Sequence, residues 1–208
     1  MKVVIFGATG SIGNQLVIQA LSLGYEVTAF VRNPQKINDL PHSSLTLIEG
    51  DVLHLNDVQE AVKGHDAVFC ALGAGRNGGV RAEGTRNIIK AMHAEGVNRL
   101  ICQTTLGAGD SWTNLNFFWK YIMFGWFLKE AFKDHEIQEG YIFGSRLGWT
   151  VIRPGAFTDG PLTGIYKHGF SVDEKNTKLK ISRADVADFM LKQLKTDEYL
   201  HKTPGLSY

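Results

Sequence analysis

Three glycines near the start of the chain have the spacing of a phosphate-binding turn. Gly7, Gly10 and Gly13 lie in the stretch GATGSIG, which directly follows the apolar run 2–6. In a turn from a strand to a helix, the first glycine permits a tight turn, the second lets the backbone approach a phosphate, and the third lets the helix pack on the strand. The free N–H groups at the start of the helix favour an anion. The stretch predicts a dinucleotide site, with a plain structural turn as the alternative.

The end of the second apolar run indicates which dinucleotide fits. Sites that prefer NAD carry an acidic residue there, which accepts a hydrogen bond from the ribose 2′-OH. This chain has Arg32 instead, followed by Lys36. Because a guanidinium can bind a 2′-phosphate in bidentate geometry, Arg32 favours NADPH (or NADP⁺), unless it only ends a strand at the surface. Asp51 could accept from the adenine amino group beside Val52, or it could be an ordinary aspartate that starts a helix.

The Tyr-x-x-x-Lys dyad of alcohol-oxidising dehydrogenases is absent from the sequence. None of the six tyrosines has a lysine four residues later, so no such lysine can lower a tyrosine pKa for proton transfer. A flavin acceptor does not need this pair, because its N5 takes a hydride and its proton can come from water. His135 and Glu139 lie four residues apart on a predicted helix, where they could pair structurally or supply a proton.

The remaining composition excludes several classes of function. Cys70 and Cys102 lie outside any CxxC or Cys/His cluster, so we expect buried free thiols in a reducing cytosol and no metal site. The formal net charge of +1 gives no sign of nucleic-acid binding. No apolar stretch approaches the roughly 20 residues of a spanning helix, and the run 2–6 is too short for a signal peptide. We expect a cytoplasmic protein without an integral membrane segment, and a monomer as its simplest state.

The elements that must position these residues alternate between strand and helix. Apolar, β-branched runs predict strands at 2–6, 26–32, 45–51, 66–73, 98–105 and 149–155, and helical spacing predicts helices at 11–24, 56–64, 81–96 and 182–194. We expect Ser11 and Gly24 to cap the first helix, and Ser182 and Asp185 to form a capping box. The alternation predicts the α/β class, as a single doubly wound Rossmann domain over 1–208 with a mainly parallel sheet flanked by helices. The ligand should lie at the carboxyl ends of the strands, where the strand order reverses.

Several stretches resemble a known family. They are GATGSIG, GYEVTAFVRNP, GDVL, DAVFCALG, EGTRNIIKAM, TVIRPG, DGPLTGIY and FMLKQLKTDEY, and they run from the first strand to near the C-terminus. With them the chain resembles the atypical short-chain dehydrogenases/reductases, most closely the biliverdin-IXβ reductase/flavin reductase family. The resemblance implies an NADPH-dependent reductase of flavins, such as FMN and riboflavin, and of linear tetrapyrroles.

The resemblance also implies roles for individual residues. The cofactor-binding residues would be Gly7, Ala8, Thr9, Gly10, Ser11, Ile12 and Gly13 at the pyrophosphate, Arg32 at the 2′-phosphate, Asp51 and Val52 at the adenine, Ala71, Leu72, Gly73 and Arg76 near the ribose, and Thr104, Pro154, Gly155, Ala156 and Phe157 around the nicotinamide. Thr105 would be the candidate catalytic hydroxyl, bonding the acceptor or the nicotinamide amide. Its alternative role is to satisfy local backbone at the end of a strand.

Two departures from the family pattern affect the chemistry. The family's fifth strand ends in Thr-Ser, whereas this chain has Thr104-Thr105, which keeps a hydroxyl. The stretch RPGAFTDG before PLTG lacks the histidine of the mammalian-type enzyme, so a proton relay through that histidine is excluded. The alternative function is therefore a non-catalytic redox sensor of the NmrA-like type, which binds NADP(H) and reports it to a partner.

Residues 112–132, the aromatic segment, contain nine aromatic side chains. A helix that is aromatic nearly all round has more apolar surface than one core contact buries. The surplus could line a flat hydrophobic pocket over the nicotinamide, as a substrate-side helix or lid, with Trp112 and Phe118 against the acceptor ring. Core packing alone, a homodimer contact and a membrane-surface contact are the alternatives.

Overall fold

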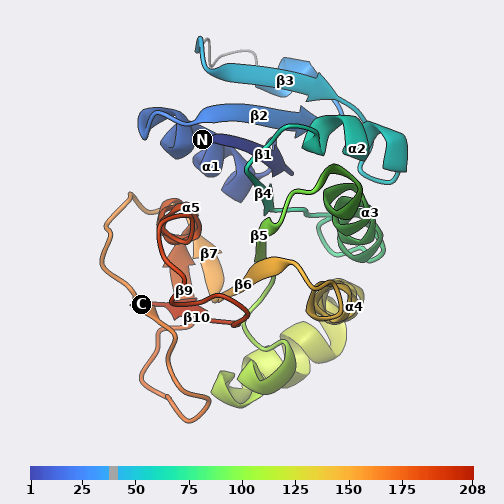
Figure 1. The fold of residues 1–208 in the computed structure, drawn as a ribbon. Coiled ribbons are helices and arrows are strands. Elements are labelled where there is room, and N and C mark those ends of the chain that lie inside the picture. The colour runs from blue at the N-terminus through green and yellow to red at the C-terminus, as the bar shows by residue number, and fades with distance from the viewer. Residues whose placement is uncertain (38–41) are drawn as a thin grey trace.

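A mainly parallel sheet runs through the protein in the computed structural model, which describes residues 1–37 and 42–208 (Figure 1). The sheet has eight strands in the order β3-β2-β1-β4-β5-β6-β10-β8. They are β1 (Lys2–Phe6), β2 (Glu26–Val31), β3 (Leu45–Glu49), β4 (Ala67–Cys70), β5 (Arg99–Gln103), β6 (Gly148–Pro154), β8 (Lys167–His168) and β10 (Gly205–Ser207). Neighbouring pairs are parallel except β10 with β8. The predicted doubly wound α/β fold is confirmed, and the strand order reverses between β1 and β4.

Four short strands were not predicted from the sequence. They are β8 and β10 at the edge of the main sheet, and β7 (Ala156–Thr158) and β9 (Lys180–Ser182), which pair with one another in parallel. Each is only two or three residues long, so no alternation of apolar and polar residues can show in it.

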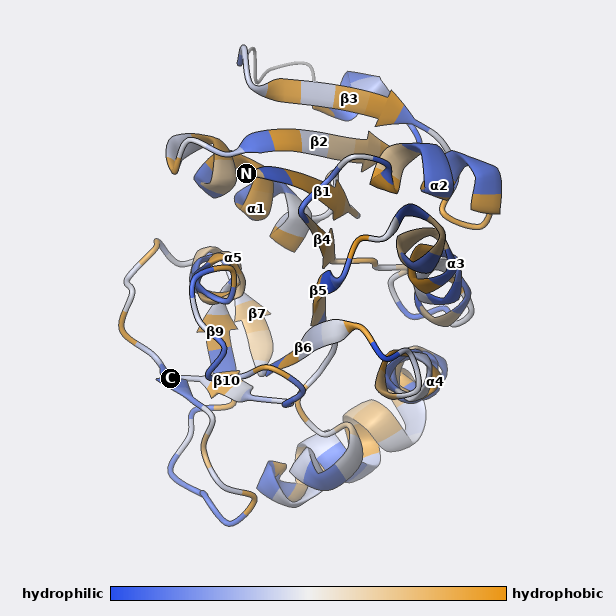
Figure 2. Cartoon of the chain, in the orientation of Figure 1, coloured by the Kyte–Doolittle hydropathy of each residue, from blue (hydrophilic) through white to orange (hydrophobic). Residues whose placement is uncertain are grey.

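Helices cover both faces of the sheet. The α-helices are α1 (Ser11–Ser22), α2 (Leu55–Val62), α3 (Val80–Glu95), α4 (Lys129–Phe143) and α5 (Arg183–Lys192), with a short 3₁₀ helix η1 (Pro34–Lys36) after β2. Figure 1 shows α1 and α5 on one face and α2, α3 and α4 on the other, and a separate apolar core lies beneath each group. Figure 2 shows the hydrophobic residues that run along the strands between these layers. Within residues 1–37 and 42–208, every helix is too short or too polar to cross a membrane.

The helix caps differ in part from those predicted. The N-cap of α1 is Gly10, without a side-chain cap, so the prediction of Ser11 was wrong. At the other end the C-cap is Leu23, and Gly24 follows it with φ +80°, the left-handed conformation in which glycine ends a helix. Ser182 does cap α5, accepting from the Asp185 N–H at 3.0 Å. The Asp185 carboxylate instead accepts from Thr163, Gly164 and Tyr208, so only half of the capping box forms.

The sequence predicts a single helix for the aromatic segment, but the structure divides it into three helical pieces. It begins in a 3₁₀ helix η2 (Gly109–Asn114), continues as a π-helix η3 (Phe118–Phe127), and enters the first turn of α4. A π-helix is wider than an α-helix and is frequently found at functional sites. The segment has its own apolar cluster around Leu106, Leu115 and Phe124, which is separate from the two cores under the sheet.

Candidate functional site

The glycine turn between β1 and α1 forms one end of a first cavity. Gly7 has φ +83°, and a Cβ there would overlap the Ala71 carbonyl beyond β4. A Cβ on Gly13 would overlap the Gly7 carbonyl, so only glycine lets α1 approach the turn this closely. Ser11 and Ile12, in the first turn of α1, line the cavity. Because first-turn N–H groups have no acceptor within their helix, the turn fits an anion such as a pyrophosphate.

The first cavity has a volume of about 350 Å³ and lies where the strand order reverses. It brings together most of the predicted cofactor residues: Gly7, Thr9, Gly10, Ser11, Ile12, Arg32, Asp51, Val52, Ala71, Leu72, Gly73 and Phe157. Ala8 and Gly13 are buried beside the turn and shape it without lining the cavity.

Arg32 and Asp51 lie at the far end of the first cavity from the second. Arg32 is exposed immediately after β2, so its guanidinium can reach a ligand phosphate. The Asp51 carboxylate accepts from the Leu53 N–H at 2.9 Å, and the Asp51 N–H donates to Asp57 at 3.0 Å. Since His54 is the N-cap of α2, Asp51 is not the residue that caps this helix. These contacts fix Asp51 at the cavity wall.

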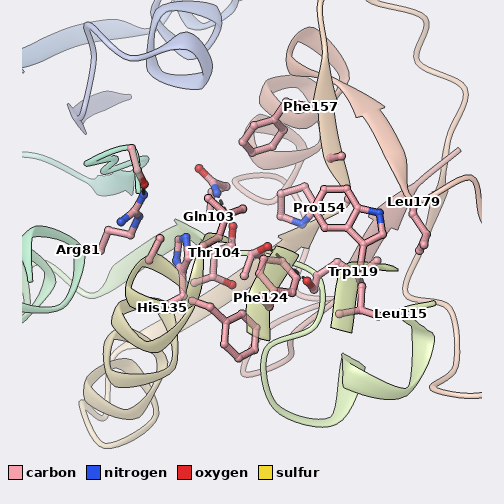
Figure 3. Close-up of a pocket in the computed structure, with 18 of the residues that line it drawn as sticks. Arg81, Gln103, Thr104, Leu115, Trp119, Phe124, His135, Pro154, Phe157 and Leu179 are labelled. Carbon is pink, nitrogen blue, oxygen red and sulfur yellow. Dashed lines mark hydrogen bonds between the residues drawn. The ribbon is translucent and has the colours of Figure 1, made fainter. Parts of the chain in front are cut away.

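A second cavity of about 320 Å³ is lined mainly by apolar side chains (Figure 3). The end of β5 contributes Gln103, Thr104, Thr105 and Leu106, and the end of β6 contributes Pro154, Gly155, Ala156 and Phe157. The aromatic segment and α4 contribute Leu115, Trp119, Phe124, Leu128, Ala131, Phe132 and His135, and the rest of the wall is Gly75, Arg81, Leu179 and Arg183. Apolar walls with few polar groups are typical of sites for small organic ligands.

Four residues line both cavities. They are Arg81, Gln103, His135 and Phe157. Figure 3 shows Arg81 and His135 on one side and Trp119 and Leu179 on the other, with Gln103 between them. The two cavities therefore adjoin, and a ligand in the first can contact a ligand in the second.

His135 is a neutral side chain at this junction. Its Nδ1 lies 3.0 Å from Gln138 Oε1, while Gln138 Nε2 donates to Thr85 at 2.9 Å. The Gln138 oxygen is thus an acceptor, and Nδ1 carries the imidazole proton. Burial and the charge of Arg81 lower the pKa of His135 to about 4. At neutral pH the imidazole has no second proton to donate, which argues against the proton-supply interpretation.

Arg81 is a buried cation on the other side of the junction. It donates to the carbonyls of Asn77 and Gly75 at 2.9 and 3.0 Å and pairs with Asp134 at 3.5 Å. Its Nε is buried and has no partner among the described residues. Burial lowers its pKa, and Asp134 opposes that shift. Arg81 is not among the site residues expected from the sequence. A cation in the first turn of α3 opposes the helix dipole, and this unfavourable position is the signal that could have identified it.

A buried ion pair connects α4 to the ends of β5 and β6. Glu139 accepts from Arg153 Nε at 3.0 Å and Nη2 at 2.7 Å, and from Thr104 Oγ1 at 2.8 Å. Arg153 also pairs with Asp110 of η2. Although burial opposes the charge, Glu139 and then Asp110 raise the pKa of Arg153. Glu139 therefore bonds Arg153 and Thr104 rather than His135, and it positions two strand ends at the second cavity.

The remaining predicted site residues line the second cavity alone or neither cavity. Thr104, Pro154, Gly155 and Ala156, predicted around the nicotinamide, line the second cavity and not the first. Thr105 lines the second cavity, with its hydroxyl donating to the Leu106 carbonyl at 3.3 Å. Arg76 lies outside both linings, donates to the Phe127 carbonyl at 3.3 Å and stacks on the Phe127 ring.

The two aromatic side chains chosen from the sequence do not line the second cavity. Trp112 packs on Phe132, and Phe118 is exposed. Trp119 and Phe124 line it instead. Nothing in the sequence distinguishes these rings from their neighbours, because the π-helical spacing that turns them inward was not predicted.

The two cysteines lie side by side in the sheet. Cys70 of β4 is in register with Cys102 of β5, and both are buried free thiols. Burial raises the pKa of the Cys102 thiol, which keeps it protonated and unreactive. Within the described ranges, no group of three or more His, Cys, Asp or Glu side chains is arranged to hold a metal ion.

Comparison with known proteins shows the family of the chain. Residues 7–197 match the model of a family described as NAD(P)H-binding. The uncharacterized protein YwnB of Bacillus subtilis is 31% identical over 208 residues, which cover 96% of this chain and 94% of YwnB.

Two solved structures share the fold. A short-chain dehydrogenase/reductase of Veillonella parvula in complex with NADP has a TM-score of 0.85 at 19% identity, covering all of this chain and 94% of the other. The anaerobilin reductase ChuY of Escherichia coli O157:H7 has a TM-score of 0.83 at 23% identity, covering all of this chain and 97% of ChuY. At these identities the two structures indicate a common fold and nothing more specific.

Proposed function

The chain belongs to the NAD(P)H-binding family, and from that premise we propose that it is an NADPH-dependent reductase that transfers a hydride to a flat-ring acceptor. Flavins such as FMN and riboflavin are the first candidates. The observation that carries the proposal is the junction, where Arg81, Gln103, His135 and Phe157 line both cavities. A cofactor in the first cavity would supply a hydride, and the second cavity offers an apolar place for its acceptor beside it.

The first cavity fits the cofactor by its shape and its donors. Gly7 and Gly13 let α1 begin close against the turn, and the unpaired N–H groups of its first turn support a pyrophosphate there. Arg32 at the rim would bind a 2′-phosphate and so favour NADPH over NADH. Asp51 and Val52 would hold the adenine, and residues 71–73 would pass beneath the ribose.

The size of the second cavity favours one fused ring system. Its volume of about 320 Å³ is near the lower end of the range for ligand sites. This favours an isoalloxazine ring over an open chain of four pyrroles, which leaves biliverdin-like tetrapyrroles as the second candidate. ChuY, which shares the fold, is an anaerobilin reductase, and this is a reason to test biliverdin-like tetrapyrroles as acceptors. The aromatic segment would form the substrate side of this site, through Trp119 and Phe124.

The chain would contribute to the reaction mainly by positioning. Thr105, which lines the second cavity at the end of β5, would bond the acceptor or the nicotinamide amide. Pro154, Gly155, Ala156 and Phe157 would back the nicotinamide. Because His135 is neutral and its Nδ1 proton points to Gln138, the proton for the reduced ring would come from water.

An oxidation assay tests the proposal against the sensor alternative. The protein is mixed with NADPH and excess FMN, riboflavin or biliverdin, and the nicotinamide absorbance is followed. Saturable, enzyme-dependent oxidation with at least one acceptor is the expected result. Tight NADPH binding without turnover on any of the three would contradict the reductase and favour an NmrA-like sensor.

A further inference from the structure

The outward side of the aromatic segment is an apolar surface that neither cavity uses. This outer aromatic face consists of Phe117, Phe118, Tyr121, Ile122, Trp126 and Phe127. Their exposed fractions run from 41% for Phe127 to 78% for Trp126. Large apolar side chains gathered on one element mark an interaction surface, whereas single exposed ones need no explanation.

The π-helix separates this face from the inner side of the segment. Its hydrogen bonds join residues five apart, so Trp119 and Phe124 lie on the same side, with ring centroids 5.7 Å apart. Both rings line the second cavity and are labelled there in Figure 3. Inner packing therefore accounts for these two rings. The outer aromatic face stays largely exposed, although Arg76 stacks on Phe127 and Phe118 meets the edge of the Trp119 ring.

We propose that the outer aromatic face docks on the surface of an anionic lipid bilayer. Trp and Tyr side chains favour the level of the lipid headgroups, where one end of the ring is apolar and the other is wet. Lys120 and Lys129 lie on the segment, and Lys133 is one turn farther on. Between Asp110 and Glu130 the sequence has no acidic residue. The segment and the turn after it thus carry three lysines against one exposed carboxylate, Glu130, and this excess of positive charge is complementary to anionic headgroups.

A second copy of the chain fits the same face less well. A stable protein interface draws about 20–30 residues from each side, whereas this face consists of one short segment. A two-fold contact through it would also bring Lys120 and Lys129 toward their own copies, with Glu130 as the one acidic residue of the segment. A bilayer avoids both difficulties, because it needs neither a large matched surface nor acidic side chains.

Vesicle sedimentation with the full chain tests the bilayer contact, and it requires no turnover and no cofactor. We expect the protein to sediment with vesicles of equal parts phosphatidylcholine and phosphatidylglycerol, and much less with phosphatidylcholine alone. Trp126→Ser should lower the partition coefficient roughly tenfold, because a largely exposed ring no longer enters the interface. The double variant Lys120→Gln/Lys129→Gln should abolish the preference for anionic vesicles.

Leu23→Ser is the matched control. Leu23 is 53% exposed at the end of α1, and Figure 1 shows α1 at the other end of the molecule from residues 109–127. This change should leave sedimentation unaltered, and unchanged melting temperatures would show that each variant is folded. Absence of binding to anionic vesicles, or undiminished binding in both Trp126→Ser and Phe117→Ser, would overturn the proposal. A lipid-free dimer that Trp126→Ser converts to a monomer would also overturn it and would assign the face to a second copy.

Discussion

The two cavities share a junction but are built in different ways. The first is built around the glycine turn and the adjacent ends of β1, β2, β3 and β4. The second is shaped by side chains from the aromatic segment, α4 and the ends of β5 and β6, which the Glu139–Arg153 pair holds together. We infer that substitutions around the first cavity alter cofactor affinity but not acceptor affinity. Substitutions around the second cavity should alter acceptor affinity or stability and leave cofactor affinity nearly unchanged.

The largest effect is expected in the glycine turn. A Cβ in Gly13→Ala would overlap the Gly7 carbonyl and displace the start of α1 from the turn. NADPH affinity should fall at least about 1,000-fold, which corresponds to about 4 kcal/mol. Gly140→Ala is the control, since a Cβ at this exposed position in α4 meets no atom within 4 Å. Calorimetric titration with NADPH measures both, and comparable affinities would contradict the role given to the turn.

The buried ion pair should have the next largest effect, in the second region. Glu139→Gln leaves the Arg153 charge buried without its partner carboxylate, which should lower the free energy of unfolding by about 3 kcal/mol. Glu136→Gln removes an exposed carboxylate on the same helix. This variant should change the free energy of unfolding by less than about 0.5 kcal/mol. Urea unfolding of the two variants makes the comparison. Equal stabilities would show that the pair does not hold the cavity wall.

The junction should be sensitive to acid. The pKa of His135 is lowered to about 4, whereas a histidine in an unfolded chain titrates at about 6.5. Between these values the unfolded chain binds a proton that the folded site does not, so stability present above about pH 6.5 is lost as the pH falls toward 4. At about pH 5 the loss should be about 2 kcal/mol relative to about pH 8. Urea unfolding of the wild type should show this loss, and His135→Gln should remove most of it. An identical pH dependence in the two proteins would contradict the lowered pKa of His135.

Arg32 should separate the two nicotinamide cofactors. Arg32→Ala should weaken NADPH binding about 30-fold, or about 2 kcal/mol, because a charge-assisted contact to the 2′-phosphate is lost. NADH affinity should not change, because NADH lacks this phosphate. Lys36→Ala is the control, since Lys36 is exposed nearby but does not line the cavity. An equal loss for both cofactors would show that Arg32 does not bind the 2′-phosphate.

The smallest expected effect distinguishes two neighbouring rings. Trp119→Ala should raise the acceptor KM about tenfold with little change in NADPH affinity, because Trp119 lines the second cavity. Phe118→Ala should leave both unchanged, because its ring is exposed on the other side of the π-helix. Steady-state kinetics with FMN decide between them. A raised acceptor KM in Phe118→Ala alone would place Phe118 against the acceptor ring, as the sequence predicts. It would also contradict acceptor binding in the second cavity.

The first region was largely predictable from the sequence, because its determinants are local. Gly7, Gly10 and Gly13 specify a turn by their spacing, and Arg32 follows its strand directly. The six main strands were predicted for the same reason, since each is a short run rich in apolar and β-branched residues. The caps of α1 were less predictable, because cap positions depend on single hydrogen bonds.

The second region depends on tertiary contacts that no local pattern encodes. Arg81, Gln103 and Arg153 come from three elements and meet only in the fold. The π-helical spacing of residues 118–127 changes which rings face inward, so Trp112 and Phe118 were chosen where Trp119 and Phe124 lie. The sequence therefore indicated the segment that lines the second cavity but not the side chains that face it.

A crystal structure of the protein with NADP⁺ and riboflavin would decide whether the two cavities work together. We predict that the pyrophosphate lies on the turn at residues 7–13, that the nicotinamide lies at the junction beside His135 and Phe157, and that the isoalloxazine ring stacks on it in the second cavity. A cofactor bound away from the glycine turn, or a flavin bound outside the second cavity, would contradict this arrangement.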